Sequence, residues 1–75
     1  MTPTEVAALM SSIVDDEIGV ADNFFEFGNS LLALRLLAVV EERCGARIGL
    51  LELIRSPTPE ELAELIAADT ATRAR

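Results

Sequence analysis

The residues whose types and spacing could support chemistry lie in the stretch DNFFEFGNSLL, from Asp22 to Leu32. Its Ser30 precedes an apolar segment whose spacing predicts a helix over residues 31–43. A hydroxyl at a helix N-terminus faces solvent and the positive end of the helix dipole, and a phosphodiester there would meet unpaired backbone N–H groups. Gly28 permits a sharp turn and a close approach of another molecule. A simpler interpretation is that Ser30 only caps the helix, because Ser is a preferred N-cap residue.

The whole segment resembles the attachment site of carrier proteins, the thiolation domains of nonribosomal peptide and polyketide assembly lines. In that family a D-x-F-F-x-L-G-G-x-S-L pattern presents the Ser that receives phosphopantetheine from coenzyme A. The resemblance implies that Ser30 bears a covalent phosphopantetheine arm, with Gly28 and Asn29 in the attachment loop. One departure is plain: the family usually has two glycines before the variable residue, whereas this sequence has only Gly28. The attachment loop is therefore expected to be one residue shorter.

Composition limits the other possibilities. The chain has 75 residues, 51% of them hydrophobic, which fits a single small domain over residues 1–75. With one Cys and no His, an internal disulfide, a metal-ligand cluster and a Cys–His or Ser–His catalytic pair are not expected. A net charge of −7 argues against a nucleic-acid binder. The most apolar run is too short to span a membrane and no leader opens the chain, so we expect a cytoplasmic monomer.

Capping signals predict the first and last helices. Thr2-Pro3-Thr4-Glu5 combines an N-cap Thr, a Pro in the first helical position and a Glu that completes a capping box. Thr58-Pro59-Glu60-Glu61 repeats these signals before the last helix. Apolar residues then recur at helical spacing, in the first helix at Val6, Leu9, Met10 and Ile13, and in the last at Leu62, Leu65 and Ile66. These helices are expected to end near Val14 and Ala68, with residues 69–75 forming a frayed tail.

The middle of the chain contains a long loop and a short helix. The loop, from about Asp15 to Asn29, carries all three aromatic residues, Phe24, Phe25 and Phe27. We expect two of them to enter the core, the alternative being that they stack on a ligand. Residues 50–55 predict a helix of one or two turns, and no strand pattern is present. The fold class is therefore all-α, a bundle of three principal helices and one short helix with a long first loop.

The second helix divides into two faces when its residues are placed at 100° intervals. One face predicts the core, at Ala33, Leu36, Leu37, Val40 and Cys44. The opposite face carries Leu31, Leu34, Arg35, Ala38, Glu41 and Glu42. On it we expect Leu31, Leu34, Arg35 and Ala38 to form a partner-recognition surface, as this helix does in the resembled family. The alternative is that Leu31 and Leu34 are isolated exposed leucines, which are common in soluble proteins.

The resemblance is closest to peptidyl carrier proteins, and it implies a covalent carrier rather than an enzyme. Because the sequence starts at Met1 and ends soon after the last helix, we expect a free-standing (type II) carrier; the alternative is a domain excised from a longer synthetase, which would look the same. A phosphopantetheinyl transferase would modify Ser30, an adenylation enzyme would load an aminoacyl or aryl group as a thioester, and condensation or tailoring enzymes would receive it. Two alternatives stay open: a polyketide-type acyl carrier, and an acidic helical module that binds partners without modification. A third is an enzyme using carboxylates of the first loop, among Asp15, Asp16, Glu17, Asp22 and Glu26, which the absence of His and Lys disfavours.

Overall fold

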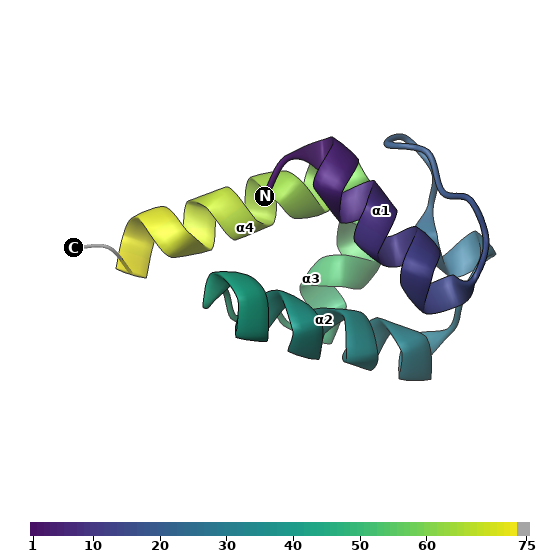
Figure 1. Cartoon of the computed structure of the whole chain (residues 1–75). Coiled ribbons are helices and arrows are strands. Elements are labelled where there is room, and N and C mark those ends of the chain that lie inside the picture. Colours follow the sequence, from purple (N-terminus) through teal and green to yellow (C-terminus); the bar gives the residue numbers. More distant parts are fainter. Residues whose placement is uncertain (74–75) are drawn as a thin grey trace.

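A computed structural model describes residues 1–73 and contains four α-helices and one 3₁₀ turn, with no strand in this range. The helices are α1 (Pro3–Val14), α2 (Ser30–Cys44), α3 (Leu50–Arg55) and α4 (Pro59–Arg73), and the 3₁₀ turn η1 spans Phe24–Glu26 (Figure 1). Helix α1 packs against α4 and α2, and α3 packs against α2. The predicted all-α bundle with one short helix and a long first loop is confirmed. In residues 1–73 no helix is long and apolar enough to cross a membrane.

Both predicted capping boxes are present. The Thr2 hydroxyl accepts the Glu5 N–H at 3.2 Å, and the Thr2 N–H donates to the Glu5 carboxylate at 3.0 Å. The same reciprocal pair joins Thr58 and Glu61 at the start of α4. Hydrogen bonds from Thr2 lower the pKa of the exposed Glu5 carboxyl. The pKa of the Glu5 carboxyl is lower in the folded state than in the unfolded state. The capping box therefore contributes fully to the free energy of unfolding above the pKa that Glu5 has in the unfolded state, and this contribution is lost as the pH falls through the pKa that it has in the folded state.

The core lies where three long helices and α3 meet. From α2 it takes the side chains predicted from the helical wheel, Ala33, Leu36, Leu37 and Val40, all buried. Cys44 differs from the prediction because it is only half-buried. It is the last residue of α2, and the chain turns away at Gly45, which has φ +73° and donates its N–H to the Glu41 carbonyl at 2.8 Å. The other buried core side chains include Val6, Leu9 and Met10 of α1, Leu53 of α3, and Leu62 and Ile66 of α4.

Helix α4 is longer than predicted. It continues past Ala68 to Arg73, so the expectation that the helix ends near Ala68 and gives way to a frayed tail is wrong for residues 69–73; residues 74–75 lie outside the described part. Hydroxyls within the helix donate to preceding carbonyls, Thr70 to Ile66 at 2.9 Å and Thr72 to Ala68 at 3.0 Å. The Asp69 carboxylate also accepts the Arg47 N–H at 3.0 Å. Because this bond comes from the connector after α2, it ties the extension of α4 to the domain.

The long first loop is held to the core by its middle residues. Ile18 and Phe24 are buried, whereas Phe25 and Phe27 are half-buried and pack against the core. The expectation that two of the three aromatic residues enter the core is therefore met by Phe24 alone, and Phe25 and Phe27 only pack against the core from its edge. Two backbone hydrogen bonds connect the loop to the start of α4: the Phe24 N–H donates to the Pro57 carbonyl at 3.0 Å, and the Glu60 N–H to the Val20 carbonyl at 3.1 Å.

Truncation of a leucine on each face of α2 should lower the free energy of unfolding by different amounts. Leu36 is fully buried, so Leu36→Ala should lower the free energy of unfolding by roughly 2–5 kcal/mol. Leu34 is 52% exposed, so Leu34→Ala should lower it by no more than about 1 kcal/mol. Urea unfolding followed by circular dichroism measures both values. Equal losses would contradict the assignment of the two faces.

Candidate functional site

Ser30 is the first residue of α2 and is exposed. The alternative interpretation, that Ser30 only caps the helix, is wrong, because Asn29 occupies the N-cap position and its side-chain oxygen accepts the Leu32 N–H at 3.0 Å. Asn and Ser are about equally favoured as caps, and the extended backbone of Asn29, with φ −140°, gives the capping geometry to Asn29. Within residues 1–73 the Ser30 hydroxyl makes no hydrogen bond. It is therefore free to react.

Gly28 sets the path of the chain into α2. Its N–H donates to the Phe24 carbonyl at 2.9 Å. A Cβ at this position would lie 3.0 Å from the Val14 side chain and 3.2 Å from the Phe24 ring, so a larger residue would require these two core side chains to shift. The shorter loop noted in the sequence thus still delivers Ser30 to the helix start, with Gly28 packed against the core and Asn29 as the cap.

The electrostatic setting of Ser30 suits an attached anion. The first turn of α2 contains no acidic residue. The Leu32 N–H is taken by the Asn29 side chain and the Ala33 N–H by the Asn29 carbonyl, and helix geometry leaves the N–H groups of Ser30 and Leu31 without an intrahelical acceptor. Those groups and the helix dipole would stabilise a phosphate on the Ser30 hydroxyl. The residues present therefore fit a phosphodiester at this position.

The outward face of α2 begins beside Ser30. Leu31 is 75% exposed, and Leu34, Arg35 and Ala38 are also exposed. The structure thus brings the sequence-predicted residues to one open helix face next to the hydroxyl.

Helix α3 adds two exposed apolar residues that the sequence reasoning missed, Leu51 and Ile54. The sequence gives no clear signal for their exposure, because at 100° intervals the four apolar residues of this short helix, Leu50, Leu51, Leu53 and Ile54, fall on one side of it. The structure buries Leu53 and leaves Leu51 and Ile54 exposed.

The loop carboxylates are not assembled into a catalytic site. Asp15, Asp16, Glu17, Asp22 and Glu26 are all exposed. Two of them stabilise local turns, Asp16 by accepting the Glu17 N–H at 2.8 Å and Asp22 by accepting the Gly19 N–H at 2.8 Å. In the part of the chain that the structure covers, no group of His, Cys, Asp and Glu side chains is arranged to hold a metal ion. This arrangement gives no support to acid–base chemistry in the loop.

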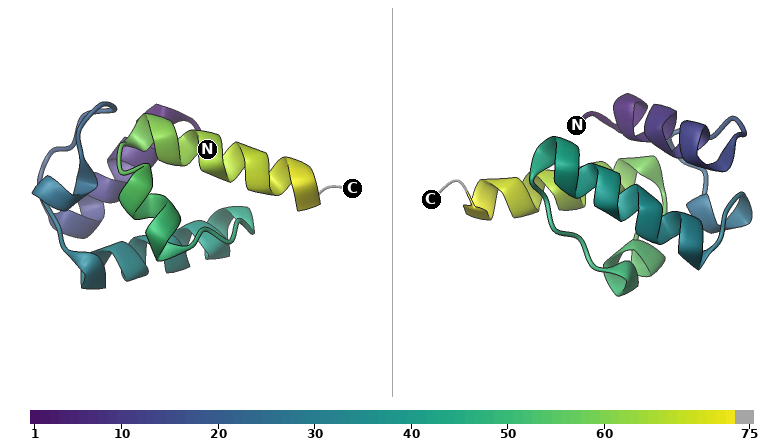
Figure 2. Two further views of the ribbon diagram at one scale, coloured as in Figure 1. Left: turned by 180° about the vertical axis from the view of Figure 1, so that it is seen from behind. Right: turned by 60° about the horizontal axis from the view of Figure 1, so that its bottom comes forward.

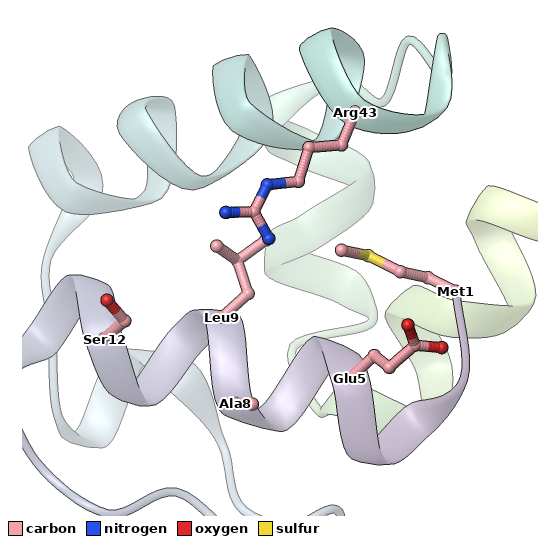
Figure 3. A pocket seen from close by; sticks show the side chains of 6 residues that line it. All are labelled: Met1, Glu5, Ala8, Leu9, Ser12 and Arg43. Atoms are coloured by element: carbon pink, nitrogen blue, oxygen red, sulfur yellow. The ribbon is translucent and has the colours of Figure 1, made fainter.

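Two cavities lie away from Ser30. One, of about 280 Å³, lies between α1 and the C-terminal end of α2, where the Arg43 side chain extends towards Leu9 (Figure 3). The other, of about 430 Å³, lies between the N-terminus and α4. Neither is lined by a residue of the attachment loop or of the first turns of α2. The candidate site itself is an exposed hydroxyl with a flanking helix face.

Comparison with known proteins gives consistent matches. A family model described as "Phosphopantetheine attachment site" matches residues 4–66. The chain is 35% identical over 69 residues to surfactin synthase subunit 1 of Bacillus subtilis (strain 168), a match covering 89% of this chain. It is also 35% identical over 69 residues to phosphinothricin tripeptide synthetase PhsB of Streptomyces viridochromogenes, again covering 89% of this chain. The chain spans only 2% and 6% of the length of these two relatives.

A solved structure shares the fold. It is the solution structure of a non-covalent extended docking domain complex of the Pax NRPS, PaxA T1-CDD/PaxB NDD. The match has a TM-score of 0.84 and 32% sequence identity, and covers 95% of this chain and 70% of that one.

The capping geometry predicts different effects of substitutions at Asn29 and Ser30. Asn29→Ala removes the cap of α2 and should lower the free energy of unfolding by about 1 kcal/mol. Ser30→Ala removes a hydroxyl with no partner and should change it by no more than about 0.5 kcal/mol. Urea unfolding of the two variants tests this, and a larger loss for Ser30→Ala would contradict the assignment of Asn29 as the cap.

Proposed function

Because the chain belongs to the phosphopantetheine attachment family of carrier domains, we propose that Ser30 is the residue that carries the arm. A domain of this family is a carrier and not a catalyst, and this one is related to the carrier domains of nonribosomal peptide synthetases. The single observation that supports Ser30 is its exposed, unbonded hydroxyl at the first position of α2. Ser11 differs, because its hydroxyl donates to the Ala7 carbonyl and accepts the Ile18 N–H.

Ser30 and its neighbours have separate roles in binding the arm. The Ser30 hydroxyl oxygen forms the ester bond to the phosphate, and the N–H groups of Ser30 and Leu31 lie on the positive end of the helix beside that charge. Gly28 and Asn29 fix where the helix begins. The thiol of the arm supplies the thioester that holds an aminoacyl or aryl group, and catalysis of loading and transfer belongs to partner enzymes.

The proposed partners are a phosphopantetheinyl transferase, a discrete adenylation enzyme, and downstream condensation or tailoring enzymes. Leu31, Leu34, Arg35 and Ala38 are proposed to form the recognition face, since they lie on one exposed side of the helix that starts at Ser30. Coenzyme A and ATP are needed for these steps, which supports a cytoplasmic site of action. We propose a free-standing monomeric carrier, and the intact mass of the protein in its native host would distinguish it from a domain of a longer synthetase.

Two other functions compete with this proposal. A polyketide-type acyl carrier would have the same fold and the same Ser. Against it, fatty-acid-type carriers resemble one another in acidic residues that flank the Ser, whereas here Asn29 precedes it and Arg35 is the one charged residue between Ser30 and Val40. A non-covalent interaction module would use the exposed leucines alone and leave Ser30 unmodified.

Modification of Ser30 is the first test. Apo protein incubated with coenzyme A, magnesium and a broad-specificity phosphopantetheinyl transferase should gain one arm per chain, measured by intact mass. Ser30→Ala should gain none. Ser12→Ala, which changes an exposed Ser of α1, is the matched control and should be modified like the wild type. An arm on every Ser30→Ala chain would refute the assignment, and an unmodified wild type would favour the non-covalent module.

The class of cargo is the second test. Holo protein should be loaded by an adenylation enzyme from its own gene neighbourhood with an amino acid or aryl acid and ATP, because its recognition face lacks the acidic groups that acyl-carrier partners pair with. The same holo protein should be a poor acceptor for an acyltransferase supplied with malonyl coenzyme A. Product masses distinguish the two reactions. Acylation from malonyl coenzyme A without ATP-dependent loading would assign the chain to the polyketide type.

A further inference from the structure

Four large hydrophobic side chains are exposed in residues 1–73, and all four belong to α2 and α3. Leu31 is 75% exposed and Leu34 52%, while on α3 Leu51 is 67% exposed and Ile54 47%. Each pair is spaced three residues apart and so lies one turn apart on a single helix face. Helix α3 packs against α2 and lies beside its N-terminal half (Figure 2). One exposed leucine has little meaning, but this concentration on two neighbouring helices is typical of an interaction surface.

An arginine follows each exposed pair. Arg35 comes four residues after Leu31, and Arg55 four residues after Leu51, so each lies one turn further along the face of its leucine. Both arginines are exposed, and neither forms an ion pair with another residue that the structure describes. Arg47 differs, because its guanidinium lies 3.3 Å from the Glu41 carboxylate.

Negative charge lies mostly elsewhere on the molecule. The chain has 13 acidic residues against 6 basic ones, yet none of the acidic residues falls between Ser30 and Val40. Helix α3 contains one, Glu52, whose carboxylate accepts the Gly49 N–H at 3.0 Å at the start of that helix. The part of the exposed α2 face between Ser30 and Val40 is therefore apolar and positively charged on a protein whose net charge is −7, whereas the exposed Glu41 and Glu42 lie at the C-terminal end of that face and Glu52 at the start of α3.

We propose that Leu31, Leu34, Leu51 and Ile54, together with Arg35 and Arg55, form one docking surface whose occupant is an enzyme surface with an apolar pocket bordered by carboxylates. The inference rests on the proposed function in one respect: the occupant is the enzyme that loads the arm on Ser30. The pocket removes the leucines from water, and its carboxylates pair with the two arginines. A partner bordered by basic residues, of the kind that suits acidic carriers, would place like charges against Arg35 and Arg55.

Charge reversal tests this chemistry. The value of kcat/KM for thioester loading is measured for holo Arg35→Glu and Arg55→Glu, with whichever enzyme, adenylation enzyme or acyltransferase, loads the wild type. Arg43→Glu is the matched control, since it makes the same change in net charge at the far end of α2 (Figure 3). We expect about a ten-fold loss for each of the first two variants, through KM, and less than about a two-fold change for the control. Raising the salt concentration should lower kcat/KM for the wild type and raise it for the two variants, because salt screens both attraction and repulsion.

Serine substitutions test whether the two helices act as one surface. Leu31→Ser and Leu51→Ser should both lower kcat/KM at unchanged melting temperature, since both side chains are largely exposed. If kcat/KM falls for the Leu31 and Arg35 variants but the Leu51 and Arg55 variants are loaded like the wild type, the two helices do not act as one surface and this part of the proposal is overturned. Undiminished loading of Arg35→Glu and Arg55→Glu, or an equal loss for Arg43→Glu, would overturn the carboxylate-bordered partner.

Binding of the unmodified chain separates this inference from the proposed function. Titration of ¹⁵N-labelled apo protein with the same adenylation enzyme or acyltransferase should shift the amide signals of α2 and α3, and the two charge-reversal variants should weaken binding. Absence of the arm in the wild type contradicts the proposed function alone. Shifts confined to α1 or α4, or no binding by a chain that is otherwise loaded normally, contradict the docking surface alone.

Discussion

The hydrogen bond from the Phe24 N–H to the Pro57 carbonyl, together with the buried Phe24 ring, is the constraint on which the functional end of the domain depends. It joins the middle of the long first loop to the segment that leads into α4. A free loop of this length would be an ensemble, because each ordered residue costs about 1–2 kcal/mol of backbone entropy. Burial of an aromatic side chain and a paired backbone group offset that cost. The loop thereby becomes a defined support for the start of α2.

Ser30 is positioned through that support. The Phe24 carbonyl accepts the Gly28 N–H, and the Phe24 ring lies so close to Gly28 that a Cβ there would force the neighbouring side chains to shift. Asn29 then adopts an extended conformation and caps α2, so the hydroxyl of Ser30 is not needed as a cap. Packing of Phe24 in the core fixes Gly28, and Gly28 places Asn29 as the cap of α2. The hydroxyl of Ser30 is thereby left without a partner at the positive end of the helix dipole.

The sequence was sufficient where the determining interactions are local. The capping boxes at Thr2 and Thr58 join residues three positions apart, and the faces of α2 follow from helical geometry, so both could be predicted. The cap of α2 could not be assigned from the sequence because Asn29 and Ser30 are adjacent and both are preferred cap residues. The extent of α4 was missed because a contact distant in sequence, from the Arg47 N–H to the Asp69 carboxylate, helps to hold it. The 3₁₀ turn at Phe24 also depends on the distant carbonyl of Pro57.

The contrast between the two faces of α2 fits the demands on a carrier. Burying Leu34 or Leu51 would stabilise a domain with so small a core, yet both lie in water while Leu36 and Leu53 fill the interior. The net charge of −7, located mainly on the first loop and on α4, keeps such a surface soluble. A carrier must also leave each enzyme after transfer, which favours a small interface of limited affinity over a permanent one. Four apolar side chains with two unpaired arginines suit that need, because complementary charge accelerates encounter more than it prolongs the complex.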